Sequence, residues 1–208
     1  MTDDDFDERV RDANETALSR LGSSKALYAN TEGEMTETAV LTSAANRLHA
    51  ASETVASWVP QESDGAATAA YDEIASEEAS HYEDLLDKLG GHEPGAVPPA
   101  QQELREAEAT VERLGGLVGA TLVAGKLTEQ RTGFFVGEAD PTTASTFRGY
   151  GDVLDEREER LLDLLDEVCA DDGDWQAAED AASAAIQAAY DEYTDRLEAM
   201  GVNPKPVC

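Results

Sequence analysis

Hydrophobic and small residues recur at spacings of three and four along most of this chain, which is the pattern of amphipathic helices. No alternating strand pattern and no run of β-branched residues competes with it. Clusters rich in Gly, Pro, Ser and Asp separate the helical stretches. The pattern predicts an all-α chain with helices over about 6–21, 31–60, 67–89, 101–132, 140–168 and 175–200, and a short helical turn through residue 29.

The connectors predict how these helices are arranged. Short turns at 61–65 and 133–141 make the helices on either side antiparallel neighbours, and the longer segment 90–99 joins the two resulting hairpins. The spacing Thr31-Glu-Gly-Glu34 fits a capping box at the start of the first long helix. We therefore expect one helical domain over 1–208: a four-helix bundle of about 32–170, with flanking helices of about 6–29 and 175–200.

The net charge of the chain narrows the range of partners and environments that fit this protein. The chain has 45 acidic and 15 basic residues, a formal net charge of −30, and the acids lie on the polar helix faces. This charge predicts a folded protein of a salt-rich cytoplasm and disfavours nucleic acids and anionic membranes as partners. We expect no signal peptide, because the N-terminus is acidic, and no membrane span. Cys169 and the terminal Cys208 form no paired motif, which fits a reducing cytosol, and we expect Cys208 to be an exposed thiol.

Glu78 and His81 are the candidate functional residues with the clearest signal. The apolar seam of the helix at 67–89 runs through Tyr71, Ile74 and Leu85, and its missing steps fall on Glu78 and His81. An unpaired carboxylate buried on such an inward face destabilises a fold by roughly several kcal/mol. Glu-x-x-His on an inward face is the ligand pair of carboxylate-bridged di-metal bundles, so the pair predicts a metal site.

The rest of a di-metal site is incomplete in the sequence. Two metals usually take a second such pair and two further acids. Glu158 lies on the seam of the second hairpin, but Leu161 stands where its histidine is needed, and His49 lies near the level of Glu78 on the first helix. The predicted metal ligands are therefore Glu78, His81, Glu158 and His49. Three outcomes stay open: a di-metal site, a one-metal site, or a core pair in which Glu78 and His81 bond each other or Arg157.

Residues 71–91, which contain Glu-Glu-Ala-Ser-His81 and end at Gly90-Gly91, resemble the second helix of the rubrerythrin and ferritin-like superfamily. The acidic, Ala-rich composition of the chain resembles that of the rubrerythrin-like proteins of haloarchaea. The resemblance implies an iron or manganese oxidoreductase acting on peroxide, oxygen or ferrous iron, with Glu78 and His81 as ligands. The chain departs from the family at Leu161, in the missing glutamate of the first helix and in the absence of rubredoxin-type cysteine motifs.

Two other functions remain open. A bundle that kept the fold and lost the metal site would act in assembly or partner binding, including self-association into a homo-oligomer. Phe134-Phe135-Val136 is then a candidate contact surface, or else a hydrophobic plug at the bundle end. A haem-oxygenase-like helical enzyme is the third class. The sequence contains no nucleophilic triad and no glycine motif that binds phosphates or dinucleotides. The three alternatives include enzymes and a non-catalytic protein, so the sequence does not decide whether the protein is an enzyme.

Overall fold

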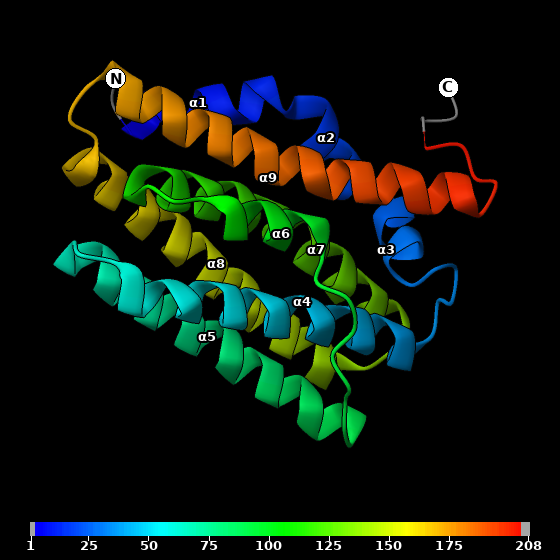
Figure 1. Ribbon diagram of the computed structural model, residues 1–208. Coiled ribbons are helices and arrows are strands. Elements are labelled where there is room, and N and C mark those ends of the chain that lie inside the picture. Colours follow the sequence, from blue (N-terminus) through cyan, green and yellow to red (C-terminus); the bar gives the residue numbers. More distant parts are fainter. Residues whose placement is uncertain (1–2, 205–208) are drawn as a thin grey trace.

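The computed structural model describes residues 3–204, and this part of the chain consists of helices and their connectors, without strands, as the hydrophobic pattern predicts (Figure 1). The helices, in chain order, are α1 Asp3–Ala13, α2 Glu15–Leu21, α3 Ser24–Asn30, α4 Glu37–Trp58, α5 Gly65–Leu89, α6 Pro99–Glu106, α7 Thr110–Gly137, α8 Pro141–Val168 and α9 Asp172–Ala199, with a single 3₁₀ turn, Val59–Gln61, after α4. Cys208 lies outside the described residues. No helix in the described range combines the length and apolarity needed to cross a bilayer.

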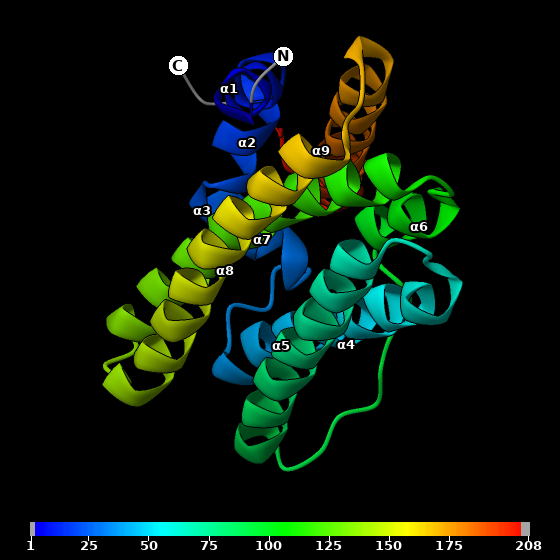
Figure 2. The same ribbon diagram turned by 90° about the vertical axis from the view of Figure 1, so that its left-hand side faces the viewer.

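Two antiparallel hairpins, α4–α5 and α7–α8, form the framework of the molecule, as the connector lengths predict. Figures 1 and 2 show α9 running along the second hairpin, with α1 and α2 beside it, where α1 also contacts α8 and α2 also contacts α7. Between the hairpins, α5 contacts α8, and α4 contacts the short helix α6. The space between the hairpins is thus bordered by α4, α5, α6, α7 and α8.

Short-range polar contacts fix where the hairpins begin and turn. The side chain of Asp64 accepts hydrogen bonds from the backbone of Ala66 and Ala67 at the start of α5, and α5 ends at Gly90, whose φ of 70° favours glycine. Asp140 caps α8 in the same way and is followed by Pro141, which suits the first turn of a helix. The caps of α5 place Glu78 in the interior of a regular helix.

The first long helix begins later than the predicted capping box. Thr36 caps α4 by accepting a hydrogen bond from Ala39, whereas Thr31 ends α3 by donating its hydroxyl to the Leu27 carbonyl oxygen. Glu32 and Gly33 both have positive φ, which breaks the helix between these threonines. The prediction of a start at residues 31–34 was therefore wrong by about one turn.

Two other predicted helices are interrupted. The first breaks at Asn14, whose side-chain amide donates to the Val10 carbonyl oxygen and to Ser183 of α9. The helix predicted over 101–132 is two helices, α6 and α7, separated by residues 107–109. There the carboxylate of Glu112 accepts hydrogen bonds from the backbone of Glu108 and Ala109 and starts α7 anew.

The helix α9 packs closely along α7 through small residues. A Cβ added at Gly115 would lie 2.2 Å from the Ala178 carbonyl oxygen, and one at Gly119 would lie 2.2 Å from that of Ala182. The small residues of this stretch therefore allow the two helices to approach closely. Because α9 covers this face of α7, a different face of α7 borders the space between the hairpins.

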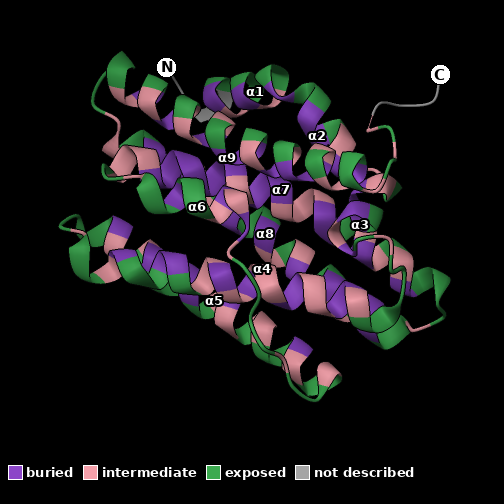
Figure 3. Cartoon of the chain, turned by 45° about the vertical axis from the view of Figure 1, so that its right-hand side comes forward, coloured by how far each residue is buried: buried purple, intermediate pink, exposed green. Residues whose placement is uncertain are grey.

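Buried residues gather on the helix surfaces that face one another, and exposed residues lie on the outer surfaces (Figure 3). One apolar cluster joins α7 and α9 to the N-terminal helices, and a second surrounds Phe135 and Phe147 at the α7–α8 turn. Phe135 is buried and stacks on Phe147, while Val136 is exposed. The segment 134–136 belongs to the last turn of α7 rather than to a loop, and Phe135 forms the predicted plug.

Candidate functional site

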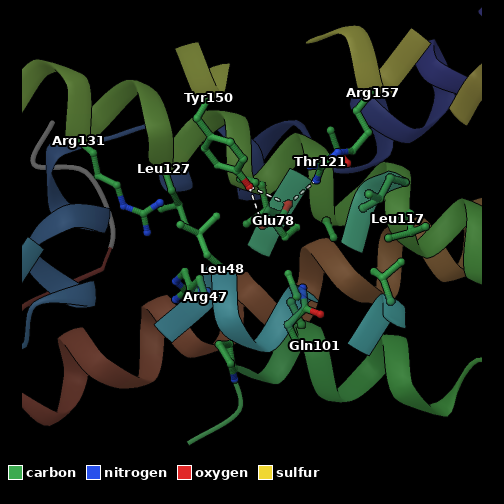
Figure 4. Close-up of a pocket in the computed structure, with 18 residues that line it drawn as sticks. Arg47, Leu48, Glu78, Gln101, Leu117, Thr121, Leu127, Arg131, Tyr150 and Arg157 are labelled. Carbon is green, nitrogen blue, oxygen red and sulfur yellow. Dashed lines mark hydrogen bonds and ion pairs between the residues drawn. The ribbon is translucent and has the colours of Figure 1, made fainter. Parts of the chain in front are cut away.

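Glu78 lies inside the bundle, as the seam of α5 predicts. Its side chain is almost fully buried, with a relative exposure of 2%. The hydroxyl of Tyr150 on α8 donates to Oε1 at 2.8 Å and lies 3.0 Å from Oε2. The guanidinium of Arg157, two turns further along α8, donates to the same carboxylate through Nη1 (Figure 4). The charge of Glu78 is therefore compensated by a cation from the neighbouring hairpin.

Arg157 is held on both sides. Its Nε donates to Glu77 at 3.0 Å, and Glu77 also receives a hydrogen bond from Arg160 at 2.5 Å. Burial alone would lower the pKa of Arg157, but the combined field of Glu78 and Glu77 raises it above its ordinary value. The network of Glu78, Glu77, Arg157 and Arg160 therefore binds α5 to α8 by alternating charges.

His81 shares the inward face of α5 with Glu78. Its ring packs against Tyr150, with centroids 4.6 Å apart, and its side chain is 18% exposed. Nδ1 is buried without a hydrogen-bond partner, and the nearest carboxylate oxygen, of Asp84, is 3.8 Å away. Burial lowers the pKa of the His81 imidazole. Glu78 and His81 thus both contact Tyr150 and are not directed into solvent.

The other predicted ligands lie elsewhere. Glu158 pairs with Arg11 of α1, so it serves the contact between α8 and the N-terminal helix. His49 packs against Tyr82, with ring centroids 5.2 Å apart. Within residues 3–204, no group of three or more His, Cys, Asp or Glu side chains is arranged to hold a metal ion. This donor set does not fit an iron or manganese centre, and the open alternative that pairs Glu78 with Arg157 is the one observed.

A pocket with a volume of about 60 Å³ lies between the hairpins and includes Glu78 in its wall (Figure 4). Its apolar wall comes from the surrounding long helices and includes Leu48, Val55, Ile74, Leu117, Val123 and Leu127. Its polar wall includes Arg47, Glu78, Gln101, Arg131, Tyr150 and Arg157. Figure 4 places Arg131 at one end and Arg157 at the other, with Tyr150 and Glu78 between them.

Arg131 differs from the other cations of this pocket because no group of the described chain pairs with it. The residue is only 4% exposed, and its Nε and Nη2 are buried without hydrogen-bond partners. Burial, assisted by the positive charge of Arg47, lowers the pKa of Arg131 to about 9. Arg47 itself is paired with Glu192 at 2.7 Å and with Asn30 at 2.6 Å. Among the described residues, the pocket therefore carries one unpaired cation.

Sequence reasoning missed Arg131, although the signal that identified Glu78 was present. Arg131 continues the apolar seam of α7 through Leu117, Ala124 and Leu127 at helical spacing. A charged residue at such a step predicts an inward charge, and this step lay one residue from the expected helix end. Tyr150, an inward residue in the sequence pattern, proved to be the hydroxyl donor of the site.

Comparisons with known proteins give this chain no relative. No protein-family model, no curated protein and no solved structure matches it. The resemblance of residues 71–91 to the ferritin-like superfamily therefore stays a prediction from the sequence.

Proposed function

We propose that this protein is a helical-bundle binding protein whose pocket between the two hairpins holds a small anion at Arg131. The observation that carries the proposal is the guanidinium of Arg131, which is buried beside the pocket with Nε and Nη2 unpartnered. A buried charge without a partner is strongly unfavourable. A bound anion would supply the missing charge and hydrogen-bond acceptors.

The neighbouring groups support an anion rather than a cation in this pocket. Glu78 is the acid in the pocket wall, and it is already bonded to Arg157 and Tyr150. Arg47 adds a second positive charge near Arg131, although Glu192 partly neutralises it. A cation at Glu78 would have to displace these internal pairs, whereas an anion at Arg131 needs no internal pair to break.

We also infer a ferritin-like arrangement of the four hairpin helices α4, α5, α7 and α8, supported by the two antiparallel hairpins and by the inward position of Glu78 and His81. In this arrangement the guanidinium of Arg157 lies where a metal would bind Glu78. The iron or manganese oxidoreductase that the sequence resemblance implies therefore has less support than its alternative, a bundle without metal chemistry. Anion binding gives that alternative a specific function.

Thermal unfolding with a panel of anions tests the proposal. Chloride, nitrate, phosphate and propionate would each be added to protein in concentrated potassium fluoride, so that ionic strength stays high and constant. At least one anion should raise the Tm of the wild type and leave Arg131→Leu unchanged, because a ligand stabilises only the state that binds it. An identical response of the two proteins to every anion would refute the proposal.

A further inference from the structure

We infer that the anion is a short-chain monocarboxylate, bound with its carboxylate at Arg131 and its alkyl chain against the apolar wall of the pocket. This inference rests on the proposed anion-binding function and names the chemical class of its ligand. Three features of the pocket lead to it: the edge of the guanidinium that is free, the size of the space and the charges that line it.

The free edge of Arg131 matches a carboxylate. Nε and Nη2 lie on the same edge of a guanidinium, and their N–H bonds are nearly parallel. Both are unpartnered in Arg131 and have almost no accessible surface, so a ligand reaches this edge once the neighbouring side chains shift. A planar carboxylate accepts two parallel hydrogen bonds from such a fork, whereas a spherical halide ion cannot accept both in ideal geometry. The unpartnered pair therefore favours a planar oxyanion over a simple halide.

The size of the pocket limits the ligand. A space of about 60 Å³ corresponds to roughly four to six water-sized spheres, each about 10–15 Å³ by this measure. Nucleotides, flavins and haem need pockets of roughly 300 Å³ or more. A ligand of about four to six non-hydrogen atoms fits, which is the range from acetate to butyrate.

The lining restricts the ligand to one charge. Leu117, Ile74 and Leu127 offer alkyl contacts but no hydrogen bonds to a second ionised group. Arg157 and Arg47 are already paired with Glu78 and Glu192, so neither of them compensates a second carboxylate. A dicarboxylate would therefore leave one charged end uncompensated, whereas a monocarboxylate with an apolar tail satisfies both parts of the pocket.

Isothermal titration of the full-length protein with acetate, propionate, butyrate and octanoate in concentrated potassium fluoride tests this inference. Propionate or butyrate should bind most tightly, octanoate should bind at least tenfold more weakly, and the uncharged propionamide should give no heat of binding. Chemical-shift changes of methyl groups on propionate addition should concentrate on Leu48, Leu117 and Leu127 in the pocket wall.

Two variants of Arg131 distinguish the contribution of its two parallel N–H donors from that of its positive charge. Arg131→Lys keeps a cation but lacks the two parallel donors, so propionate affinity should fall at least tenfold. Arg131→Leu should abolish binding while the protein stays folded, because an apolar residue replaces an unpaired buried charge. Arg148→Leu is the matched control on the exposed surface of α8 and should bind propionate like the wild type.

The outcomes distinguish this inference from the function on which it rests. If chloride or nitrate binds as tightly as propionate, and Arg131→Leu abolishes both, the carboxylate assignment is wrong and anion binding stands. Tightest binding of octanoate or of a dicarboxylate would likewise overturn the short-chain monocarboxylate and leave anion binding in place. If no anion binds the wild type, or if Arg131→Leu binds propionate normally, the assignment and the proposed function are both wrong.

Discussion

The carboxylate of Glu78 is accommodated inside the bundle because Arg157 and Tyr150 bring a cation and a hydroxyl donor to it. Both partners come from α8, across the space between the hairpins. Arg131 lies in the wall of the same pocket, and its Nε and Nη2 have no partner among the described residues. Glu78 and Arg157 therefore form a structural ion pair, whereas the unpaired Arg131 is a candidate ligand site.

Removal of Arg157 should cost far more than removal of its surface neighbour. Arg157→Met leaves Glu78 buried without its cation, and we expect a loss of roughly 3–5 kcal/mol in the free energy of unfolding. Arg160→Met, at a residue 37% exposed, should cost less than about 1 kcal/mol. Chemical denaturation in high salt measures both values.

A double variant shows whether the loss belongs to the pair. Glu78→Leu combined with Arg157→Met removes both charges, and most of the lost stability should return, because paired apolar replacements of a buried ion pair are often neutral or better. If the double variant is less stable than Arg157→Met alone, Glu78 does not depend on Arg157 for its compensation.

His92 should make stability sensitive to mild acid. Its Nε2 lies 3.0 Å from Asn46 Oδ1 and its Nδ1 lies 3.0 Å from the Tyr82 hydroxyl. Burial, and then the nearby His49, lower the pKa of His92. Because the folded pKa lies below the unfolded one, this contribution is full above the unfolded pKa of about 6.5 and declines as pH falls toward the folded pKa.

The measurement is the difference in unfolding free energy between wild type and His92→Asn at a series of pH values from neutral to mildly acidic. The difference should shrink as pH falls, because the variant lacks the titrating imidazole. Comparison with His81→Asn separates the two histidines, since burial lowers the pKa of His81 as well. A difference that stays constant or grows in acid would contradict the assignment.

Individual helices were more predictable than their interruptions. Periodicity located the long helices, although the start of α4 was wrong and the helix predicted over 101–132 is two helices, because each long helix buries one continuous face. The break at Asn14 depends on Ser183, far along the chain, and the start of α7 depends on the side chain of Glu112. Apolar periodicity records the buried face of a helix, but neither the distant contact of Asn14 nor the side-chain cap at Glu112.

The candidate site was predictable in part for a related reason. Helical spacing identified the inward face of α5 and so placed Glu78 correctly. On α8 the same spacing selected Glu158, whereas its neighbour Arg157 reaches Glu78 and Glu158 pairs with Arg11. Adjacent residues differ by about 100° around a helix, and the seam alone does not say which of them contacts a given partner.

The contact between α7 and α9 gives a test at the scale of helices. At Gly119 a Cβ would meet the backbone of Ala182 at 2.2 Å, so Gly119→Ala must push the helices apart. We expect a loss of about 1–3 kcal/mol or more, as for other overpacked interiors. Thermal or chemical denaturation in high salt measures the change.

Gly125, in the same helix, is the matched control. A Cβ there meets no atom within 4 Å, so Gly125→Ala adds helix propensity without a clash. It should raise stability by about 0.5–1 kcal/mol. Equal effects of the two substitutions would show that the α7–α9 approach is looser than the structure indicates.

The whole molecule carries a formal charge of −30, with 45 acidic and 15 basic residues. Like charges at this density repel one another in the folded state, and dissolved salt screens that repulsion. We expect the Tm to rise by many degrees between dilute and concentrated potassium chloride, and the same series in potassium fluoride separates screening from chloride binding. A Tm that is constant or falls with salt would contradict the prediction of a salt-adapted protein.

The most direct test of the central claim compares the unfolding free energy of wild type and Arg131→Leu, each with and without saturating propionate. Without propionate, Arg131→Leu should be at least as stable as the wild type, because the substitution removes an uncompensated buried charge. Propionate at about 100 times its Kd should then stabilise the wild type alone, by about 2.7 kcal/mol. If Arg131→Leu is less stable without propionate and both proteins respond to propionate equally, Arg131 is a structural residue and the pocket is not an anion site.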